Sequence, residues 1–534
     1  MVSRLPFIAL LLATTAGMEA LLWQALGSEI WLAARLAMAL LFLPIAIWLG
    51  ICVGNAIPGF LILVLARRAA RIVLPVTGDI EHAPLTLRTA IAVTVRNEDI
   101  AAVIDNLTAL LAGLDDPAHF AGFILSDTQD PALASAEALA AQGRPVTYRR
   151  RSRNTGFKAG NVMEFLDHHA EGFDVTLMLD ADSTMAPASV RRLVRIMQAD
   201  PRMGLVQHLT AGRPAEAAFA RLFQFGMRSG MRVWSVGQAL WQGRAGPYWG
   251  HNAIFRNAPF RELCRLDPLP DGSVILSHDQ VEAARLAAAG WGVAVWAEDA
   301  GSYEANPPAM PEFLHRDGRW LAGNMQYRHL IVLPGFTVMG RWQLLQAMLL
   351  FAGAPLYALM FLLAVALAGH GGSRGALVSF ALAWALTLYA PKLLGYLETL
   401  LFPTRRAAYG GGWRFLAGAL AETLFTLLLD APSYISKSLA LLRLILGAKP
   451  GWLPQNRSAR GVAWGEAARL FWPHTLIGVV TFAALLRADP GLAFLAFPFA
   501  GGLLLVIPFC VLTASPRVSA WLRARGVCAM PEEV

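Results

Sequence analysis

Long apolar runs occur at both ends of the chain, and a stretch of mixed polarity separates them. The apolar runs are residues 5–26, 30–66, 342–369, 375–402, 470–487 and 491–514. A helix needs roughly 20 apolar residues to cross a bilayer, so the pattern predicts an integral membrane protein with six crossings. The run 30–66 is longer than one span requires, and we expect one crossing followed by an interfacial or tilted extension.

Residues 413–446 are apolar but contain four residues that disfavour a membrane span, Glu422, Asp430, Pro432 and Lys437. A charge at the bilayer centre costs a few kcal/mol, on the order of 3 kcal/mol by insertion scales. We therefore expect an amphipathic helix pair that lies in the membrane interface.

Basic residues predict the orientation, because Lys and Arg near the ends of spans favour the cytoplasmic side. Six crossings with an interfacial 413–446 place every basic cluster on one side. We expect a bacterial inner (cytoplasmic) membrane protein whose termini and central domain are cytoplasmic. The predicted segments are helices in 1–72, a soluble domain in 75–340, helices in 341–402, interfacial helices and a loop in 413–465, helices in 466–516 and a tail in 517–534.

The central stretch alternates between short apolar runs and helical patterns. "TAIAVTV", "FAGFILS", "PVTYRRR" and "FDVTLMLD" are typical of strands, and "IAAVIDNLTALLAGL" and "GFKAGNVMEFLDHH" are typical of the helices between them. Such alternation predicts an α/β domain with a mostly parallel sheet. The fold class we expect is this domain inserted in an α-helical transmembrane domain.

Composition supports a membrane protein and excludes several site types. Of the 534 residues, 56% are hydrophobic and 15% are charged. The four cysteines are far apart and form no C-x-x-C pair, which argues against zinc sites and disulfide frameworks. The net charge of +8 is explained by the cytoplasmic excess of Lys and Arg, so we expect no nucleic-acid partner.

Two carboxylates, Asp180 and Asp182, follow the strand "VTLML" directly. They could be no more than a helix cap and a turn residue, because an isolated D-x-D is common. Their position after a strand, with Asp127 and Lys158 upstream, favours a site for a hard divalent cation, which often bridges carboxylates and substrate phosphates.

Other polar side chains also follow predicted strands. Asn97 and Glu98 end the first strand, and Asp127 ends the second. Ligands of parallel α/β sheets bind beyond the carboxyl ends of the strands, so these side chains should meet Asp180 and Asp182 at one sheet edge.

Two downstream motifs each allow two interpretations. In "ILSHDQVEAA", Ser277 or Asp279 could be a helix N-cap, or Asp279 could be a general base presented by a helix start. Arg316, Arg319 and Trp320, in "RDGRW", could belong to a basic helix on the membrane or could neutralise a leaving diphosphate and stack on a sugar.

Asp127, Asp180-x-Asp182, Asp279 and the Arg316-to-Trp320 motif together resemble the D, D-x-D, T/S-x-D and Q/R-x-x-R-W signature of processive family 2 glycosyltransferases such as bacterial cellulose synthase. Several sequence segments resemble those of the glucans biosynthesis glucosyltransferase H family: "LSDTQDP", "YRRRSRNTGFKAGN", "YWGHNAIFR" and "LPQNRSARGVAWGEA". This resemblance runs from about residue 85 to 480. The first motif departs from the pattern, since Ser126 precedes Asp127 where a paired Asp is usual.

On the donor side, the resemblance implies UDP-glucose at the sheet edge and Mg²⁺, or alternatively Mn²⁺, as cofactor. The expected metal ligands are Asp180 and Asp182, and Asp279 is the expected catalytic base. The donor would contact Asn97, Glu98, Asp127, Lys158, Asp180, Arg316 and Arg319.

On the acceptor side, the resemblance implies a growing glucan chain that contacts Trp320, His251 and Asn252. His251 could equally be a hydrogen-bonded core residue. The loop 452–464 resembles a gating loop by position, and Gln455, Asn456, Arg457 and Arg460 would close over UDP. A plain basic loop is the alternative.

The activity implied is an inverting, processive synthesis of the β-glucan, β-1,2 in linkage, that forms the backbone of osmoregulated periplasmic glucans, with export across the membrane. Membrane lipid, an acyl carrier protein and a periplasmic glucan-handling protein are the other expected partners. Three alternatives stay open: another membrane β-glycan synthase, a transferase that acts on a lipid phosphate, and a catalytically silent transporter or scaffold. A scaffold would need none of the three aspartates at 180, 182 and 279.

Overall fold

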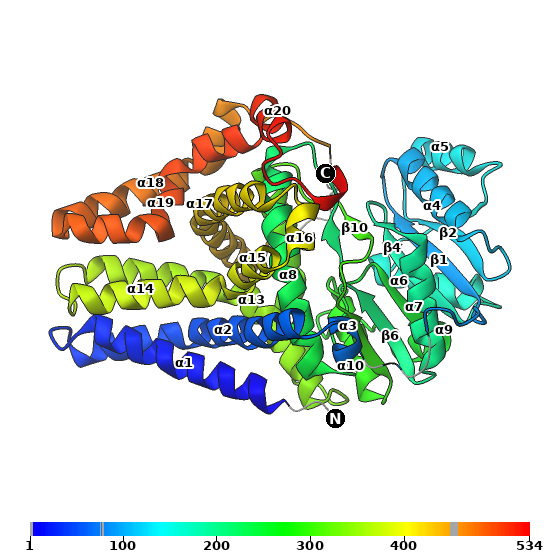
Figure 1. Cartoon of the computed structure of the whole chain (residues 1–534), viewed down its shortest axis with the longest axis horizontal. Helices are drawn as coiled ribbons and strands as arrows, with labels where there is room; N and C mark the ends of the chain where they lie inside the picture. The colour runs from blue at the N-terminus through cyan, green and yellow to red at the C-terminus, as the bar shows by residue number, and fades with distance from the viewer. Residues whose placement is uncertain (1–3, 75, 77–79, 449–457) are drawn as a thin grey trace.

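The computed structural model describes residues 4–74, 76, 80–448 and 458–534. A bundle of long helices forms one side of the molecule, and an α/β domain forms the other (Figure 1). Both termini lie at the boundary between these two parts.

A seven-stranded sheet forms the centre of the α/β domain, with the strand order β3-β2-β1-β4-β8-β6-β9. Strands β3, β2, β1 and β4 are parallel neighbours, and β8 is antiparallel to both β4 and β6. The prediction of a mostly parallel sheet is thus confirmed. The strands are β1 Thr89–Val95, β2 Phe120–Ser126, β3 Val146–Arg150, β4 Val175–Asp180, β6 Met203–His208, β8 Ala253–Arg256 and β9 Gly292–Trp296.

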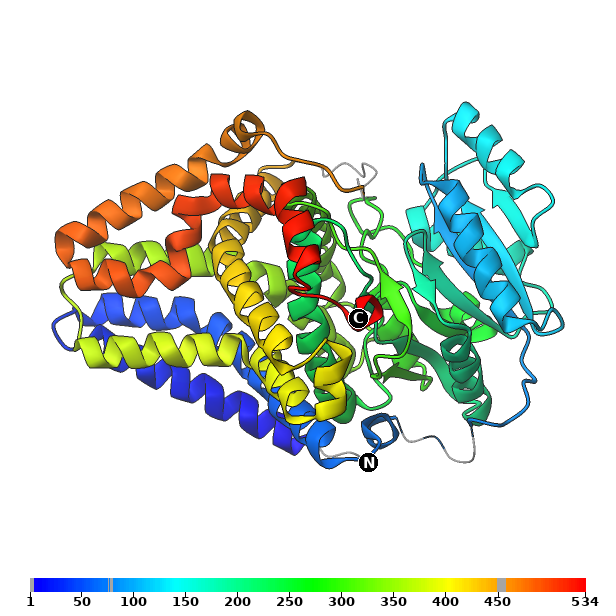
Figure 2. The same ribbon diagram turned by 45° about the horizontal axis from the view of Figure 1, so that its top comes forward.

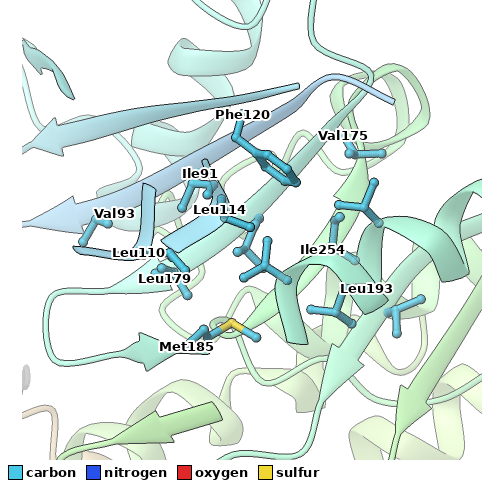
Figure 3. Packing of buried hydrophobic residues seen from close by; sticks show 14 of the residues in the cluster. Ile91, Val93, Leu110, Leu114, Phe120, Val175, Leu179, Met185, Leu193 and Ile254 are labelled. Carbon is cyan, nitrogen blue, oxygen red and sulfur yellow. The ribbon is translucent and has the colours of Figure 1, made fainter. Parts of the chain in front are cut away.

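Alternating side chains let this sheet bury both of its faces. On β1, Ile91 and Val93 point to one face and Ala90 and Ala92 to the other. The first face packs against Leu110 and Leu193 of its covering helices (Figure 3). The helices on this face are α4 Ile100–Leu114 and α7 Pro187–Ala199, and those on the other are α6 Phe157–His168, α9 Asn257–Leu263 and α10 Asp279–Ala288.

A small sheet lies beside the end of β4. Its order is β5-β10-β7, and β10 pairs antiparallel with β5 and parallel with β7. Since β5 follows Asp182 almost directly, this sheet anchors the chain just after the two carboxylates. Its strands are β5 Thr184–Met185, β7 Ala211–Gly212 and β10 Ser302–Glu304, and the nearby helices are α5 Pro131–Ala141, α11 Met310–Met325 and α12 Tyr327–Leu330.

Six helices of the described residues are long and apolar enough to cross a membrane, or up to seven if a bent pair counts as one span. Three connections, α1–α2, α13–α14 and α18–α19, lie together at the end remote from the α/β domain (Figure 1). There the Gly372 amide donates to the Ala25 carbonyl at 3.0 Å, and Arg374 pairs with Asp489 at 2.5 Å. The six are α1 Leu5–Leu26, α2 Leu32–Leu65, α13 Val338–Ala366, α17 Gly412–Ile445, α18 Trp464–Ala488 and α19 Pro490–Thr513, and α14 Arg374–Leu388 is the first half of the bent pair.

The run 375–402 differs from the straight span that the sequence predicts. It forms two helices, α14 and α15 Ala390–Leu401, with a bend of 67° between them. Pro391 stands in the first turn of α15, where the missing amide costs nothing because that group has no partner in the preceding turn.

The prediction of a helix pair over 413–446 is wrong, because these residues form the single helix α17. Its two acidic residues have partners: Glu422 pairs with Lys392 at 2.6 Å, and Asp430 accepts a hydrogen bond from the Tyr389 hydroxyl at 2.5 Å. Pairing within the bundle lowers the cost of charge in an apolar helix, so one continuous helix can form.

A helix that the sequence analysis did not single out, α8 Ala218–Gln242, joins the two parts of the molecule. It contacts α2, α15 and α17 on the bundle side and β7 and β9 on the domain side. Figure 2 shows it running between the bundle and the sheets. The remaining helices are α3 Ala69–Val73, α16 Pro403–Ala408, α20 Pro516–Ala524 and the 3-10 turn Pro531–Glu533.

Candidate active site

The carboxyl end of β4 brings three predicted residues and one new contact together. Asp180 is the last residue of β4 and pairs with Lys158 from the first turn of α6. The Lys158 ammonium also donates to the Gly250 carbonyl at 2.8 Å. Asp182 follows in the turn before β5. Asp180 therefore lies at the sheet edge beside a cation, and Asp182 follows it two residues later.

Asp279 lies close to this cluster. A Cβ built on Gly250 would be 3.7 Å from the Asp279 carboxylate, so Gly250 contacts Lys158 on one side and faces Asp279 on the other. Asp279 is the first residue of α10, and its N-cap is His278, which makes no side-chain capping hydrogen bond within the described part of the chain. The structure thus places neither Ser277 nor Asp279 at the N-cap position.

The surroundings of Asp279 suit a proton acceptor. Burial raises the pKa of Asp279, and the adjacent His278 opposes part of that rise. His278 itself bonds through Nδ1 to Glu282 at 2.8 Å. Burial would lower the pKa of His278, but the Glu282 carboxylate raises it above its ordinary value. A carboxylate with a raised pKa is a stronger base than an exposed one.

His251 and Asn252 follow Gly250 directly in the chain. His251 bonds to the Asn252 side chain at 3.1 Å and pairs with Glu304 of β10 at 3.3 Å. Asn252 donates to the Ser302 hydroxyl at 2.8 Å and has a left-handed backbone with φ of 49°. Both predicted residues are thus held by β10, and Glu304 is a contact that the sequence pattern did not reveal.

Helix α11 carries the predicted arginines and tryptophan. The Arg316 guanidinium lies 4.5 Å from the centre of the Trp320 ring, so a cation lies beside an aromatic plane. Burial lowers the pKa of Arg316, and the carboxylates of Asp317, Glu304 and Asp182 oppose this shift. Arg319 lies three residues further along, on the same side of the helix.

Asp127 is bound by another residue of its own domain. Both of its carboxylate oxygens accept from Arg151, which follows β3. Burial raises the pKa of Asp127, and Arg151 opposes this rise. Only the basic run "YRRRSR" in the sequence hints at such a partner.

Asn97 and Glu98 occupy the turn after β1. The backbone N–H of Asn97 donates a hydrogen bond to the Thr128 hydroxyl at 2.9 Å, and Asn97 has a left-handed backbone with φ of 56°. Thr128 in turn donates to Glu137 of α5 at 2.6 Å, and Ser126 donates to the same carboxylate at 2.6 Å. The buried Glu137 thus connects the ends of β1 and β2, and no sequence motif marks it.

The gating-like loop is described only in part. Gln455, Asn456 and Arg457 lie outside the described residues. Arg460 bonds to Glu312 of α11 at 2.6 Å and to Glu466 of α18 at 2.9 Å. It links the loop to the helix that carries Arg316.

The described residues contain no cluster of three or more His, Cys, Asp or Glu side chains arranged to hold a metal ion. Asp180 and Asp182 nevertheless offer hard oxygen ligands at one strand end. Mg²⁺ is commonly held by one or two carboxylates together with substrate phosphates and water. The two residues fit an ion that arrives with a phosphorylated substrate.

Comparison with known proteins gives consistent results. Residues 175–397 match the family model described as "Glycosyl transferase family group 2". The chain is 32% identical over 529 residues to glucans biosynthesis glucosyltransferase H of Xanthomonas euvesicatoria, covering 92% of this chain and 81% of that protein. The protein of the same name from Caulobacter vibrioides is 34% identical over 93% of this chain and 79% of its own length.

A solved structure with a similar arrangement is a mannosyltransferase from Pyrobaculum calidifontis in complex with GDP-Man and Mn2+. It has a TM-score of 0.42 and 18% identity, and it covers 66% of this chain and 98% of its own.

Proposed function

The chain belongs to the glucans biosynthesis glucosyltransferase H family, and on that premise we propose that it transfers glucose from UDP-glucose to a growing β-glucan. The observation that carries this proposal is the arrangement around Gly250. Lys158, paired with Asp180, lies on one side of that residue, and Asp279 faces it on the other. A candidate phosphate-binding group and a candidate base therefore both lie next to one residue, Gly250.

In this proposal the diphosphate of the donor is bound by Asp180, Asp182 and Lys158. The two carboxylates would hold Mg²⁺ or Mn²⁺, which when bound neutralises charge on the diphosphate. Lys158 would contact a phosphate oxygen, and Arg316 and Arg319 would stabilise the charge that develops on the leaving UDP. Asn97, Glu98 and Asp127 lie at the strand ends where the nucleoside would bind.

The acceptor end falls to Asp279. Its carboxylate takes the proton from the attacking hydroxyl as that oxygen bonds to the anomeric carbon, and the bond to the β-phosphate breaks. A single in-line displacement converts an α-linked donor into a β-linked product. Trp320, which is 47% exposed, would stack on the terminal sugar, and His251 and Asn252 would contact its hydroxyls.

An in vitro synthesis assay, followed by analysis of the linkage of the radiolabelled product, tests this proposal. Purified protein in detergent, incubated with radiolabelled UDP-glucose and Mg²⁺, should produce a polymer with β linkages, expected to be β-1,2. A cellulose-like linkage would indicate another β-glycan synthase. Label that enters the organic phase would indicate a lipid phosphate acceptor, and no transfer at all would indicate a silent scaffold.

We further propose that the protein spans a bacterial inner membrane with its α/β domain in the cytoplasm and that its product is exported. Both ends of α17 support an interfacial position for that helix. The ring of Phe415 packs against the ring of Phe225 of α8, with 5.2 Å between the ring centres. The Lys437 ammonium pairs with the Asp317 carboxylate of α11 at 3.0 Å. Since α8 lies between the bundle and the sheets and α11 carries Arg316 and Trp320, a helix that contacts both would lie along the membrane surface. An acyl carrier protein and a periplasmic glucan-handling protein stay proposed partners.

Cysteine labelling tests this orientation. Gly371→Cys, in the α13–α14 connection, should react with an impermeant thiol reagent added to intact spheroplasts. Ala407→Cys and Ala459→Cys, which flank α17, should react only after permeabilisation, because an interfacial helix keeps both flanks inside. The native cysteines are buried and provide a low background. External labelling at exactly one of the two flanks would show that α17 crosses.

A further inference from the structure

Arg151 has an unusual number of partners for a residue outside the predicted site. Its side chain is 2% exposed and pairs with both oxygens of Asp127. Its remaining donors point to the turn that follows: Nη1 bonds to the Thr155 carbonyl and Nη2 to the Phe157 carbonyl, each at 2.7 Å. One guanidinium therefore joins the end of β2 to the start of α6.

The turn that Arg151 holds has a strained backbone. Gly156 and Phe157 both have left-handed conformations, with φ of 72° and 49°. A bulky residue such as Phe rarely adopts a positive φ, and surrounding contacts must maintain it. Two such contacts come from Arg151, and a third joins the Asn154 side chain to the Asp127 carbonyl at 2.8 Å.

Lys158 follows this turn directly. Helix α6 begins at Phe157, and its N-cap is Gly156, which has no side chain to fix the helix start. Close packing across the turn adds to the constraint, because a Cβ on Gly160 would clash with the Thr155 carbonyl and lie 3.2 Å from Arg151. The direction in which Lys158 leaves the helix therefore depends on the turn.

We propose that Arg151 is a positioning residue: anchored by Asp127, it holds the turn 154–157 so that Lys158 reaches Asp180 and the Gly250 carbonyl. Arg151 acts through Lys158 and does not itself contact the donor. The inference rests on the proposed function, in which Lys158 binds a phosphate of UDP-glucose. It gives Asp127 a structural task as the anchor of Arg151.

A double-mutant cycle tests whether Arg151 acts through Lys158. Arg151→Ala should lower the turnover of UDP-glucose by roughly 100-fold, the size expected when a reacting group is misplaced by about 1 Å. Lys158→Ala should lower turnover at least as much, and the double variant should be no slower than Lys158→Ala. Additive losses, or further weakening of UDP binding when Arg151 is lost from Lys158→Ala, would overturn the proposal.

Two further variants separate positioning from general destabilisation. Arg151→Lys keeps the charge but cannot form the forked contact with Asp127, so its turnover should resemble that of Arg151→Ala. Arg153→Ala removes an exposed arginine directly before the turn and should keep normal turnover. Guanidinium added to the assay should partly restore the turnover of Arg151→Ala and should not change the turnover of Lys158→Ala. Wild-type turnover in Arg151→Lys would contradict the proposal.

Hydrogen exchange gives a readout that does not depend on activity. Peptides that cover 154–162 should exchange faster in Arg151→Lys than in the wild-type protein. In Arg153→Ala they should exchange at the wild-type rate, because only the loss of Arg151 releases the turn. Equal protection in all three proteins would contradict the proposal. Full activity of Lys158→Ala would instead contradict the proposed donor site, so the two failures can be told apart.

Discussion

Asp279→Asn is expected to give a folded, membrane-inserted protein that binds UDP and makes no polymer. Asparagine matches aspartate in size and caps helices about as well, but it cannot accept the proton of the attacking hydroxyl. Loss of a general base typically lowers the rate by about 100- to 10,000-fold. UDP binding should persist because Lys158 and Asp180 are unchanged. Initial rates with radiolabelled UDP-glucose and a UDP binding isotherm measure the two properties.

The local geometry makes this variant informative. Because His278 is the N-cap of α10, a stability effect of losing a cap residue is not expected at position 279. Asp271→Asn is a matched control, since Asp271 is an aspartate of the preceding loop that bonds to Ser273 and lies away from Gly250. Near-normal turnover in Asp279→Asn would place the base elsewhere, and His278 would then be the next candidate.

Asp182→Ala should abolish glucose transfer because a metal bound with the donor would lose a carboxylate ligand. The lost stabilisation of the leaving diphosphate should raise the barrier by several kcal/mol, roughly 4 kcal/mol, or about a thousandfold in rate. Turnover across a Mg²⁺ titration measures this effect, and excess EDTA should reproduce it in the wild-type protein.

Glu171→Ala is the control for general charge loss, because Glu171 is an exposed carboxylate on the loop before β4. It should retain wild-type turnover and the same Mg²⁺ dependence. Full activity of Asp182→Ala, or of the wild-type protein in EDTA, would rule out a metal at the proposed pair.

Much of the architecture follows from local sequence patterns. The alternation of apolar and helical runs predicted the mostly parallel sheet, and Asp180 indeed stands at the end of β4. Such features depend on residues close in sequence: a period of two defines a buried strand, and parallel strands present their carboxyl ends at one edge. Asp279 at the start of a helix is of the same kind, since the apolar spacing of "VEAARLAAAG" predicts where that helix runs.

Membrane segments show where local pattern is insufficient. Long apolar runs produced a single helix in α13 and a pair bent by 67° in α14 and α15. The charges of α17 argued against one long helix, yet Lys392 and Tyr389 pair with them from α15 and from the residue before it. Hydropathy cannot register such pairing, because it counts each charge as if it faced lipid.

The sequence by itself determined that Asp180 stands at a strand end and that Asp279 stands at a helix start. Tertiary structure alone decided the partners of several site residues. Arg151 forms an ion pair with Asp127, and Glu304 pairs with His251. Glu137 accepts hydrogen bonds from both Thr128 and Ser126. Arg151 stands 24 residues from Asp127. Glu304 is 53 positions beyond His251 (304 minus 251). Only packing of the sheet and its helices selects partners at such separations, because the sequence spacing between them carries no periodic signal.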